Sequence, residues 1–173
     1  MIRAAYQLTD QGIAEPILIG DREKVWAQME ELGLNFDPEV VDPDEDNLDP
    51  YADRLYELRK RHGLTRREAD DLIEDGNYLG SVMVEVGDAD ALLTGLMHHY
   101  PAALRPPLQV IGTADDADYA GGVYMLTFKN RVVFCVDATV NQDPTQDVLE
   151  EMTRHTAELA QRFNIEPRAA LLS

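Results

Sequence analysis

The sequence predicts an α/β protein with three layers, α/β/α, built around a mainly parallel sheet and carrying a helical insertion around residues 44–86. Short apolar runs of strand length alternate with longer stretches of helical periodicity, which is the pattern of α/β units. The chain also has 173 residues, enough for one domain with a real hydrophobic core.

Local signals predict the individual elements in order along the chain. Gly12 and Gly33 are expected to end helices at their C-termini. Asp21 is a predicted helix N-cap, and Thr65 matches a capping box with Glu68. The predicted helices are 2–11, 22–31, 51–62, 66–74, 77–86, 102–111 and 144–163. The predicted strands are 16–19, 40–41, 91–93, 123–128, 132–136 and 168–172.

The segment from residue 123 onward predicts a β-hairpin followed by a long helix. Its two apolar strands flank the turn Lys129-Asn130-Arg131. Cys135 is the only cysteine, so no intramolecular disulfide is possible, which fits a reducing compartment. It lies in the apolar run of the second strand, where a small buried side chain is expected. Asp143 and Pro144 are expected to begin the helix.

The charge of the chain excludes several classes of partner. There are 33 acidic and 15 basic residues, a formal net charge of −18, which repels nucleic acid and anionic membranes. Such an acidic, lysine-poor composition is typical of a halophilic protein. The acidic segment 42–50 lacks EF-hand spacing, so we expect a solvated loop there. With no apolar run near the ~20 residues of a membrane span, a cytoplasmic location is expected.

One segment points to a phosphate-bearing ligand. The apolar run 91–93 predicts a buried strand, and Thr94-Gly95 follows at its carboxyl end, where α/β sheets bind ligands. A glycine there allows a ligand to approach the backbone closely. Arg105 comes on the next element, and a guanidinium can bind phosphate through two hydrogen bonds.

The same segment resembles the phosphate acetyl/butyryltransferase family. The pattern Gly-x-x-Asp-Ala-x-x-Thr-Gly over 87–95 is followed by Leu-Arg-Pro at 104–106. Further pieces, at 3–5, 12–21 and 56–60, are similar to the family in the same order. Pieces at 98–100, 137–141, 163–168 and 170–173 are similar to one subgroup, the transferase-like domain at the C-terminus of NADP-dependent malic enzymes.

The resemblance implies an organisation and a set of site residues. Residues 1–173 would be the N-terminal part of such a domain, incomplete at both ends, because the family's catalytic Ser-Arg pair belongs to a later half. No catalytic residue is therefore assigned in this chain, and no metal ligands are expected. Arg59 and Arg105 would contact CoA and its phosphates, together with Thr94 and Gly95.

Each of these residues also has a plain structural explanation. Arg59 could be a surface arginine paired to an acid one turn away, such as Asp53. Thr94 and Gly95 could simply form a turn. The bulky loop residues His98, His99 and Tyr100 replace small residues of active transferases, so they could contact a nucleotide or a partner.

Three functions follow from these observations. The first is an acyl-CoA-binding domain, with acetyl-CoA or CoA as ligand, that regulates an NADP-dependent malic enzyme. The oxidoreductase core of that enzyme would lie in another domain, because no Gly-x-Gly-x-x-Gly fingerprint for a dinucleotide occurs in this sequence. The second is part of a catalytic phosphate acetyltransferase that moves an acyl group between CoA and phosphate. The third is a scaffold without a ligand. The expected partners are the rest of the domain or parent enzyme, and a second copy in a homodimer.

Overall fold

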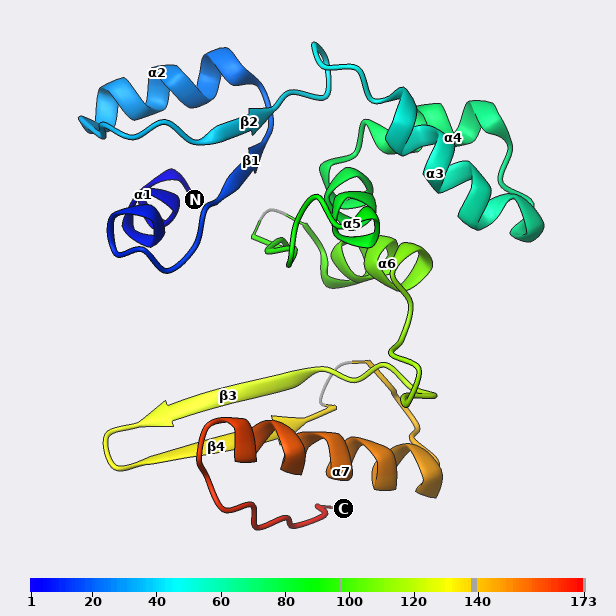
Figure 1. Cartoon of the computed structure of the whole chain (residues 1–173). Coiled ribbons are helices and arrows are strands. Elements are labelled where there is room, and N and C mark those ends of the chain that lie inside the picture. Colours follow the sequence, from blue (N-terminus) through cyan, green and yellow to red (C-terminus); the bar gives the residue numbers. More distant parts are fainter. Residues whose placement is uncertain (97, 138–139, 173) are drawn as a thin grey trace. The chain divides into compact units, whose positions relative to one another are not determined.

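A computed structural model describes residues 1–96, 98–137 and 140–172. The chain divides into two units, Met1–Gly112 and Thr113–Ser173. The first contains α1 (Ile2–Asp10), β1 (Ile17–Ile19), α2 (Arg22–Leu32), β2 (Glu39–Val41), α3 (Asp49–Arg59), the 3₁₀ helix η1 (Lys60–His62), α4 (Arg66–Ile73), α5 (Gly76–Val86) and α6 (Tyr100–Val110). The second contains β3 (Val123–Phe128), β4 (Arg131–Val136) and α7 (Gln146–Arg162) (Figure 1). The predicted α/β class is confirmed.

The N-terminal part of the first unit is a parallel strand pair with helices. Strand β1 pairs with β2 in parallel, with Leu18 opposite Val40. Helix α2 joins the two strands, as the α/β pattern predicts. The Asp21 carboxylate accepts a hydrogen bond from the backbone N–H of Lys24, and Gly33 ends the helix in the left-handed conformation. Both predicted helix ends are therefore confirmed.

The helices α3 to α6 enclose the core of the first unit. Leu55, Leu79 and Val82 are fully buried there, and Ile19 of β1 packs against the same cluster. Helix α5 approaches β1 closely at Gly80, where a Cβ atom would lie 3.2 Å from Ile19 Cδ1. The helical segment predicted around residues 44–86 is present, since α3, η1, α4 and α5 lie within it.

The capping box predicted at Thr65 is confirmed. The Thr65 hydroxyl accepts a hydrogen bond from the backbone N–H of Glu68, and the Glu68 carboxylate accepts one from the backbone N–H of Thr65. This reciprocal pair satisfies two backbone donors at the start of α4. Glu68 also lines a pocket between the helices.

The strand predicted at 91–93 is wrong. Residues 91–95 form no regular element, and Leu93 is 77% exposed. A strand requires a neighbour to accept and donate its backbone hydrogen bonds. Among the described residues, the sheet of the first unit contains only β1 and β2, so residues 91–93 have no strand partner. Leu92 is still partly buried, because its side chain packs over Gly80 of α5. Tyr100, predicted in a loop, is the first residue of α6.

The second unit is an antiparallel hairpin with a helix. Val123 pairs with Val136 at one end and Phe128 with Arg131 at the other. The turn therefore consists of Lys129 and Asn130, while Arg131, predicted in the turn, is the first residue of β4. Helix α7 buries Val148, Met152 and Ala160, but it begins at Gln146 with Thr145 as N-cap, two residues later than expected. Within the described ranges, no helix combines the length and apolarity that crossing a bilayer requires.

Two further predictions for the second unit are wrong. Cys135 is exposed instead of buried, and every residue of β3 is exposed. Residues 168–172 form no strand, and Leu172 is 96% exposed. The common reason is the lack of neighbours among the described residues, because the two sheets contain only two strands each and no third strand covers these apolar runs.

Candidate functional site

Two arginines from distant parts of the chain line one pocket in the first unit. Arg59 is the last residue of α3, and Arg105 lies in the middle of α6. The pocket has a volume of about 290 Å³, and we call it the arginine pocket. Its other polar lining residues are His62, Glu68, Tyr78 and Gln109, and its remaining walls are Leu55, Gly63, Leu64 and Leu72.

Local sequence signals place these side chains. Helix α3 ends at Arg59, continues into η1, and then reverses at Gly63, whose φ of +91° suits glycine. This turn brings α4 back beside α3. On α6, Arg105 and Gln109 are four residues apart, so they share one face of the helix.

The two arginines of this pocket have no acidic partner among the described residues, in contrast to Arg54 and Arg22 of the same unit. Arg54 pairs with Glu85, and Arg22 pairs with Glu45 and Asp46. Within the part of the chain that the structure describes, neither Arg59 nor Arg105 forms an ion pair. Two unpaired guanidinium groups in one pocket attract an anion and can bind it by charge-assisted hydrogen bonds.

The structural explanation for Arg59, an ion pair with a neighbouring acid, is wrong. Asp53 pairs with Arg66 instead, and Glu57 pairs with Lys60. The acids within one turn of Arg59 are thus engaged elsewhere. Arg59 is partly buried at the wall of the pocket.

Glu68 is the carboxylate that lines the pocket, and the capping box holds it. Its Oε2 atom accepts hydrogen bonds from the backbone N–H of Thr65 at 2.8 Å and from the Thr65 hydroxyl at 2.7 Å. Both hydrogen bonds lower the pKa of Glu68, and the bond from the backbone N–H has the larger effect. The carboxylate is therefore charged near neutral pH but is engaged with the helix end.

Tyr78 forms the buried side of the pocket. Its side chain is 9% exposed, and its hydroxyl donates a hydrogen bond to Gln109 Oε1 at 2.7 Å. Burial raises the pKa of Tyr78, while the positive charges of Arg105 and Arg59 oppose that rise. The net shift is upward, so the hydroxyl stays protonated and acts as a donor.

Sequence reasoning did not identify Tyr78 and Gln109. The spacing of four between Arg105 and Gln109 is a signal that could have found Gln109. No local signal points to Tyr78, which is 31 residues from its partner.

Thr94 and Gly95 lie outside the lining of this pocket. The Thr94 hydroxyl donates a hydrogen bond to Asn77 Oδ1, and Asn77 is 3% exposed in the first turn of α5. Gly95 has a φ of +105°, which only glycine adopts readily. The turn is therefore anchored beside Tyr78, and a ligand contact from Thr94 or Gly95 stays a prediction.

The loop residues His98 and His99, and Tyr100 at the start of α6, are exposed and do not line the arginine pocket. His99 is the N-cap residue of α6, but its side chain makes no capping hydrogen bond. Across residues 1–96, 98–137 and 140–172, no three His, Cys, Asp or Glu side chains gather as a metal ion would require. A nucleotide or partner contact from this loop stays a prediction.

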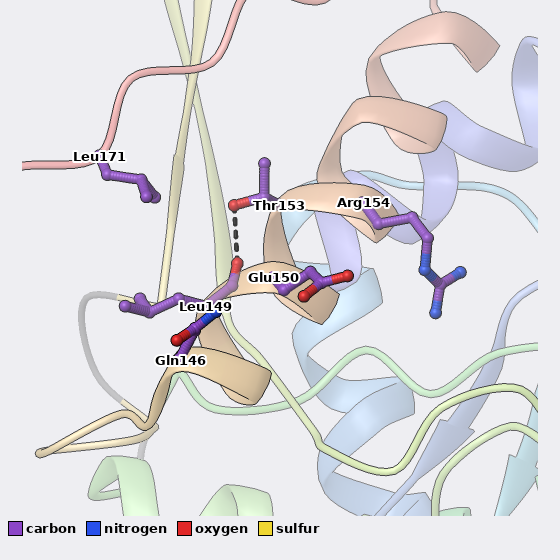
Figure 2. Close-up of a pocket in the computed structure, with 6 residues that line it drawn as sticks. All are labelled: Gln146, Leu149, Glu150, Thr153, Arg154 and Leu171. Atoms are coloured by element: carbon purple, nitrogen blue, oxygen red, sulfur yellow. Dashed lines mark hydrogen bonds between the residues drawn. The ribbon is translucent and has the colours of Figure 1, made fainter.

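A larger pocket of about 590 Å³ lies in the second unit, but its chemistry differs. It is formed by one face of α7 and Leu171 (Figure 2). Two of its polar side chains are engaged: Thr153 donates to the Leu149 carbonyl at 2.7 Å, and Arg154 pairs with Glu158 and donates to the Asp116 carbonyl. Figure 2 shows Arg154 extending away from Leu171. This pocket does not direct cationic groups at a common point.

The chain is similar to phosphate acetyltransferases of several bacteria. The model of the phosphate acetyl/butaryl transferase family matches residues 1–173. A phosphate acetyltransferase of Corynebacterium glutamicum is 33% identical over 100% of this chain and 53% of its own length. One from Escherichia coli is 36% identical over 99% of this chain and 24% of its own length.

Solved structures agree with these relatives. A phosphotransacetylase from Streptococcus pyogenes matches with a TM-score of 0.91 and 33% identity, over 99% of this chain and 53% of the other. A EutD phosphotransacetylase from Staphylococcus aureus matches with a TM-score of 0.82 and 28% identity, over 96% of this chain and 51% of the other.

The chain spans between about a quarter and about half of the length of these curated relatives. The relatives are phosphate acetyltransferases, so the finer similarity to the malic enzyme subgroup stays a prediction. Because the family model covers the whole chain, this chain belongs to the phosphate acetyl/butaryl transferase family.

Proposed function

We propose that this chain supplies part of the CoA-binding site of an acyl transfer between CoA and phosphate. The observation that carries the proposal is the arginine pocket, which Arg59 and Arg105 both line while neither forms an ion pair among the described residues. A volume of about 290 Å³ is small for a whole coenzyme but suits a phosphoryl group and its surroundings. CoA carries phosphoryl groups at one end and the reacting thiol at the other.

In this proposal the two arginines bind and orient rather than react. In the acyl transfer, the CoA thiolate attacks the acyl carbonyl and phosphate leaves, or the reverse occurs. Arg59 and Arg105 would neutralise the charge of a CoA phosphoryl group. The binding energy gained there would position the distant thiol, which is how remote contacts contribute to catalysis.

The family comparisons favour transferase chemistry over a regulatory role. The named relatives are phosphate acetyltransferases, and none of these is a malic enzyme. Regulation of an NADP-dependent malic enzyme by acetyl-CoA remains a second candidate, supported by the bulky exposed side chains of His98, His99 and Tyr100. Homodimerisation and a cytoplasmic location are further expectations that accompany either function.

The first test is calorimetric titration of CoA and acetyl-CoA into the chain in molar potassium chloride. Loss of one charge-assisted hydrogen-bonding group costs about 1.5–3 kcal/mol, so Arg59→Ala and Arg105→Ala should each weaken binding by about 10- to 100-fold. Arg67→Ala is the matched control, because Arg67 is an exposed arginine of α4 that does not line the pocket. It should bind like the wild type.

The titration also separates the proposed functions. Unchanged binding in both arginine variants would overturn the assignment of this pocket. No heat from a folded wild-type chain would favour the scaffold function. If binding depends on both arginines, an assay of acetyl transfer to phosphate in the full-length parent protein, with the same variants, distinguishes an enzyme from a regulator.

A further inference from the structure

Gln109 has one polar atom engaged and one available at the wall of the arginine pocket. Its Oε1 atom accepts the hydrogen bond from the Tyr78 hydroxyl at 2.7 Å. The carboxamide is planar, and its oxygen and nitrogen point in different directions, so this bond turns Nε2 away from Tyr78. Among the described residues, no protein acceptor is bonded to Nε2.

The surroundings of Tyr78 determine which way the carboxamide faces. The charged groups that act on its hydroxyl are Arg59, Arg105 and Asp75. A guanidinium has only donors to offer, and the Asp75 carboxylate accepts from the backbone N–H groups of Asn77 and Tyr78 instead. A neutral, buried hydroxyl therefore needs an acceptor from another group, and Gln109 supplies it through Oε1. Tyr78 thereby fixes Gln109 with its amide donor free.

The free donor lies on the same helix face as one of the pocket's cations. Gln109 and Arg105 are four residues apart on α6, and both line the pocket that Arg59 lines from α3. Two charged donors and one neutral donor, from two helices, thus line the same pocket. Phosphoryl oxygens have enough lone pairs to accept from all three.

We propose that Gln109 is a further phosphate-contacting residue of the arginine pocket, donating through Nε2, and that Tyr78 is its positioning residue. This inference rests on the proposed function, because it names another contact at the same site. Tyr78 itself does not touch the ligand, and its effect passes through the Gln109 carboxamide.

The test is a double-mutant cycle on the full chain, with CoA as the titrated probe. Gln109→Leu removes the donor and should weaken CoA binding by about tenfold, the effect of a hydrogen bond to a charged group. Tyr78→Phe keeps the ring and removes the hydroxyl, so binding should weaken by about threefold as the carboxamide loses its orientation. The double variant should bind no more weakly than Gln109→Leu alone.

Two more variants separate a binding role from a structural one. Gln109→Glu still offers Tyr78 an acceptor, so the fold is retained, but it places a carboxylate where the donor was; CoA binding should weaken more than in Gln109→Leu. Gln28→Leu is the control, an exposed glutamine of α2 outside the pocket, and should bind like the wild type. Circular dichroism checks that each variant is folded.

The outcomes distinguish this inference from the proposed function. Wild-type affinity in Gln109→Glu and Tyr78→Phe, with binding still lost in Arg59→Ala and Arg105→Ala, would overturn the inference and leave the proposed function standing. Additive losses in the double variant would contradict the positioning role of Tyr78. If the arginine variants bind normally, the proposed function fails and this inference fails with it.

Discussion

The two units of this chain contain similarly apolar elements but bury them to different degrees. In Met1–Gly112, the helices α3 to α6 surround Leu55, Leu79 and Val82, which are fully buried. In Thr113–Ser173, the buried residues that the structure describes all lie on α7, while strand β3 is exposed along its whole length. An apolar pattern therefore shows which side chains can be buried, and only the neighbouring elements decide which ones are.

The largest expected effect compares one leucine from each unit. Leu79→Ala should lower the free energy of unfolding by about 3 kcal/mol, because it leaves a cavity in a closed core. Leu126→Ala removes the same atoms from a side chain that is 43% exposed, so it should cost less than about 1 kcal/mol. Urea denaturation followed by circular dichroism measures both values. Equal losses would show that the hairpin is buried as fully as the helical core.

A smaller effect concerns the ion pair between α3 and α5 of the first unit. The hydrogen bond from Arg54 lowers the pKa of Glu85, and this effect is larger than the opposing effect of burial. A carboxyl group whose pKa is lowered on folding stabilises the protein above its unfolded pKa of about 4.3, and this contribution is lost as the pH falls through the folded pKa. The free energy of unfolding of the wild type should therefore decrease as the pH falls from about 4.3 through the folded pKa of Glu85.

The matched variant Glu85→Gln removes this titration. We expect it to be less stable than wild type at neutral pH by less than about 1 kcal/mol, and the difference should shrink as the pH falls below the glutamate range. Melting temperatures between neutral and acidic pH provide the measurement. A difference that does not change with pH would mean that the Arg54–Glu85 pair does not stabilise the charged carboxylate.

A third prediction compares how one carboxylate in each pocket affects the affinity for CoA. Glu68 lines the arginine pocket, and Glu150 lines the pocket on α7. Glu68→Gln removes a negative charge beside Arg59 and Arg105, so CoA affinity should rise by about threefold, the effect of a weak, partly screened repulsion. Glu150→Gln is the control and should leave CoA affinity unchanged. A rise in Glu150→Gln instead would locate the ligand in the second unit.

The smallest expected effect concerns the rate at which a reagent labels the native cysteine. Cys135 is exposed on β4, so in the folded chain a thiol reagent should label it at a rate within about tenfold of the rate for the urea-unfolded chain. A rate lower by several orders of magnitude would show that the hairpin is covered, for instance by a second copy. Repeating the measurement at increasing protein concentration distinguishes these cases.

Local features of the fold could be predicted from the sequence. The cap at Asp21, the box of Thr65 and Glu68, and the turn at Lys129 and Asn130 each depend on residues within a few positions of one another. Their hydrogen bonds form wherever the helix or hairpin forms. This is why the predicted helices and the hairpin are close to those observed.

Burial of the apolar runs could not be predicted in the same way. The run 91–93 and the run 168–172 have the composition of buried strands, but neither finds a strand to pair with in the described chain. Cys135 is exposed for the same reason. Strand formation depends on backbone groups that lie far away in sequence, and composition does not contain that information.

The helix caps at Asp21, Gly33 and Thr65 and the position of the hairpin could be predicted from the sequence, because they depend on local hydrogen bonding. Arg105 was a candidate anion-binding residue from its side-chain chemistry beside a predicted strand end, and Arg59 from the family resemblance. The packing of the helices was needed to show that the two arginines line one pocket, that Asp53 and Glu57 pair with other residues, and that the Tyr78 hydroxyl donates a hydrogen bond to Gln109. The physical reason is that these relations join residues of different helices, and their distances are set by how those helices pack.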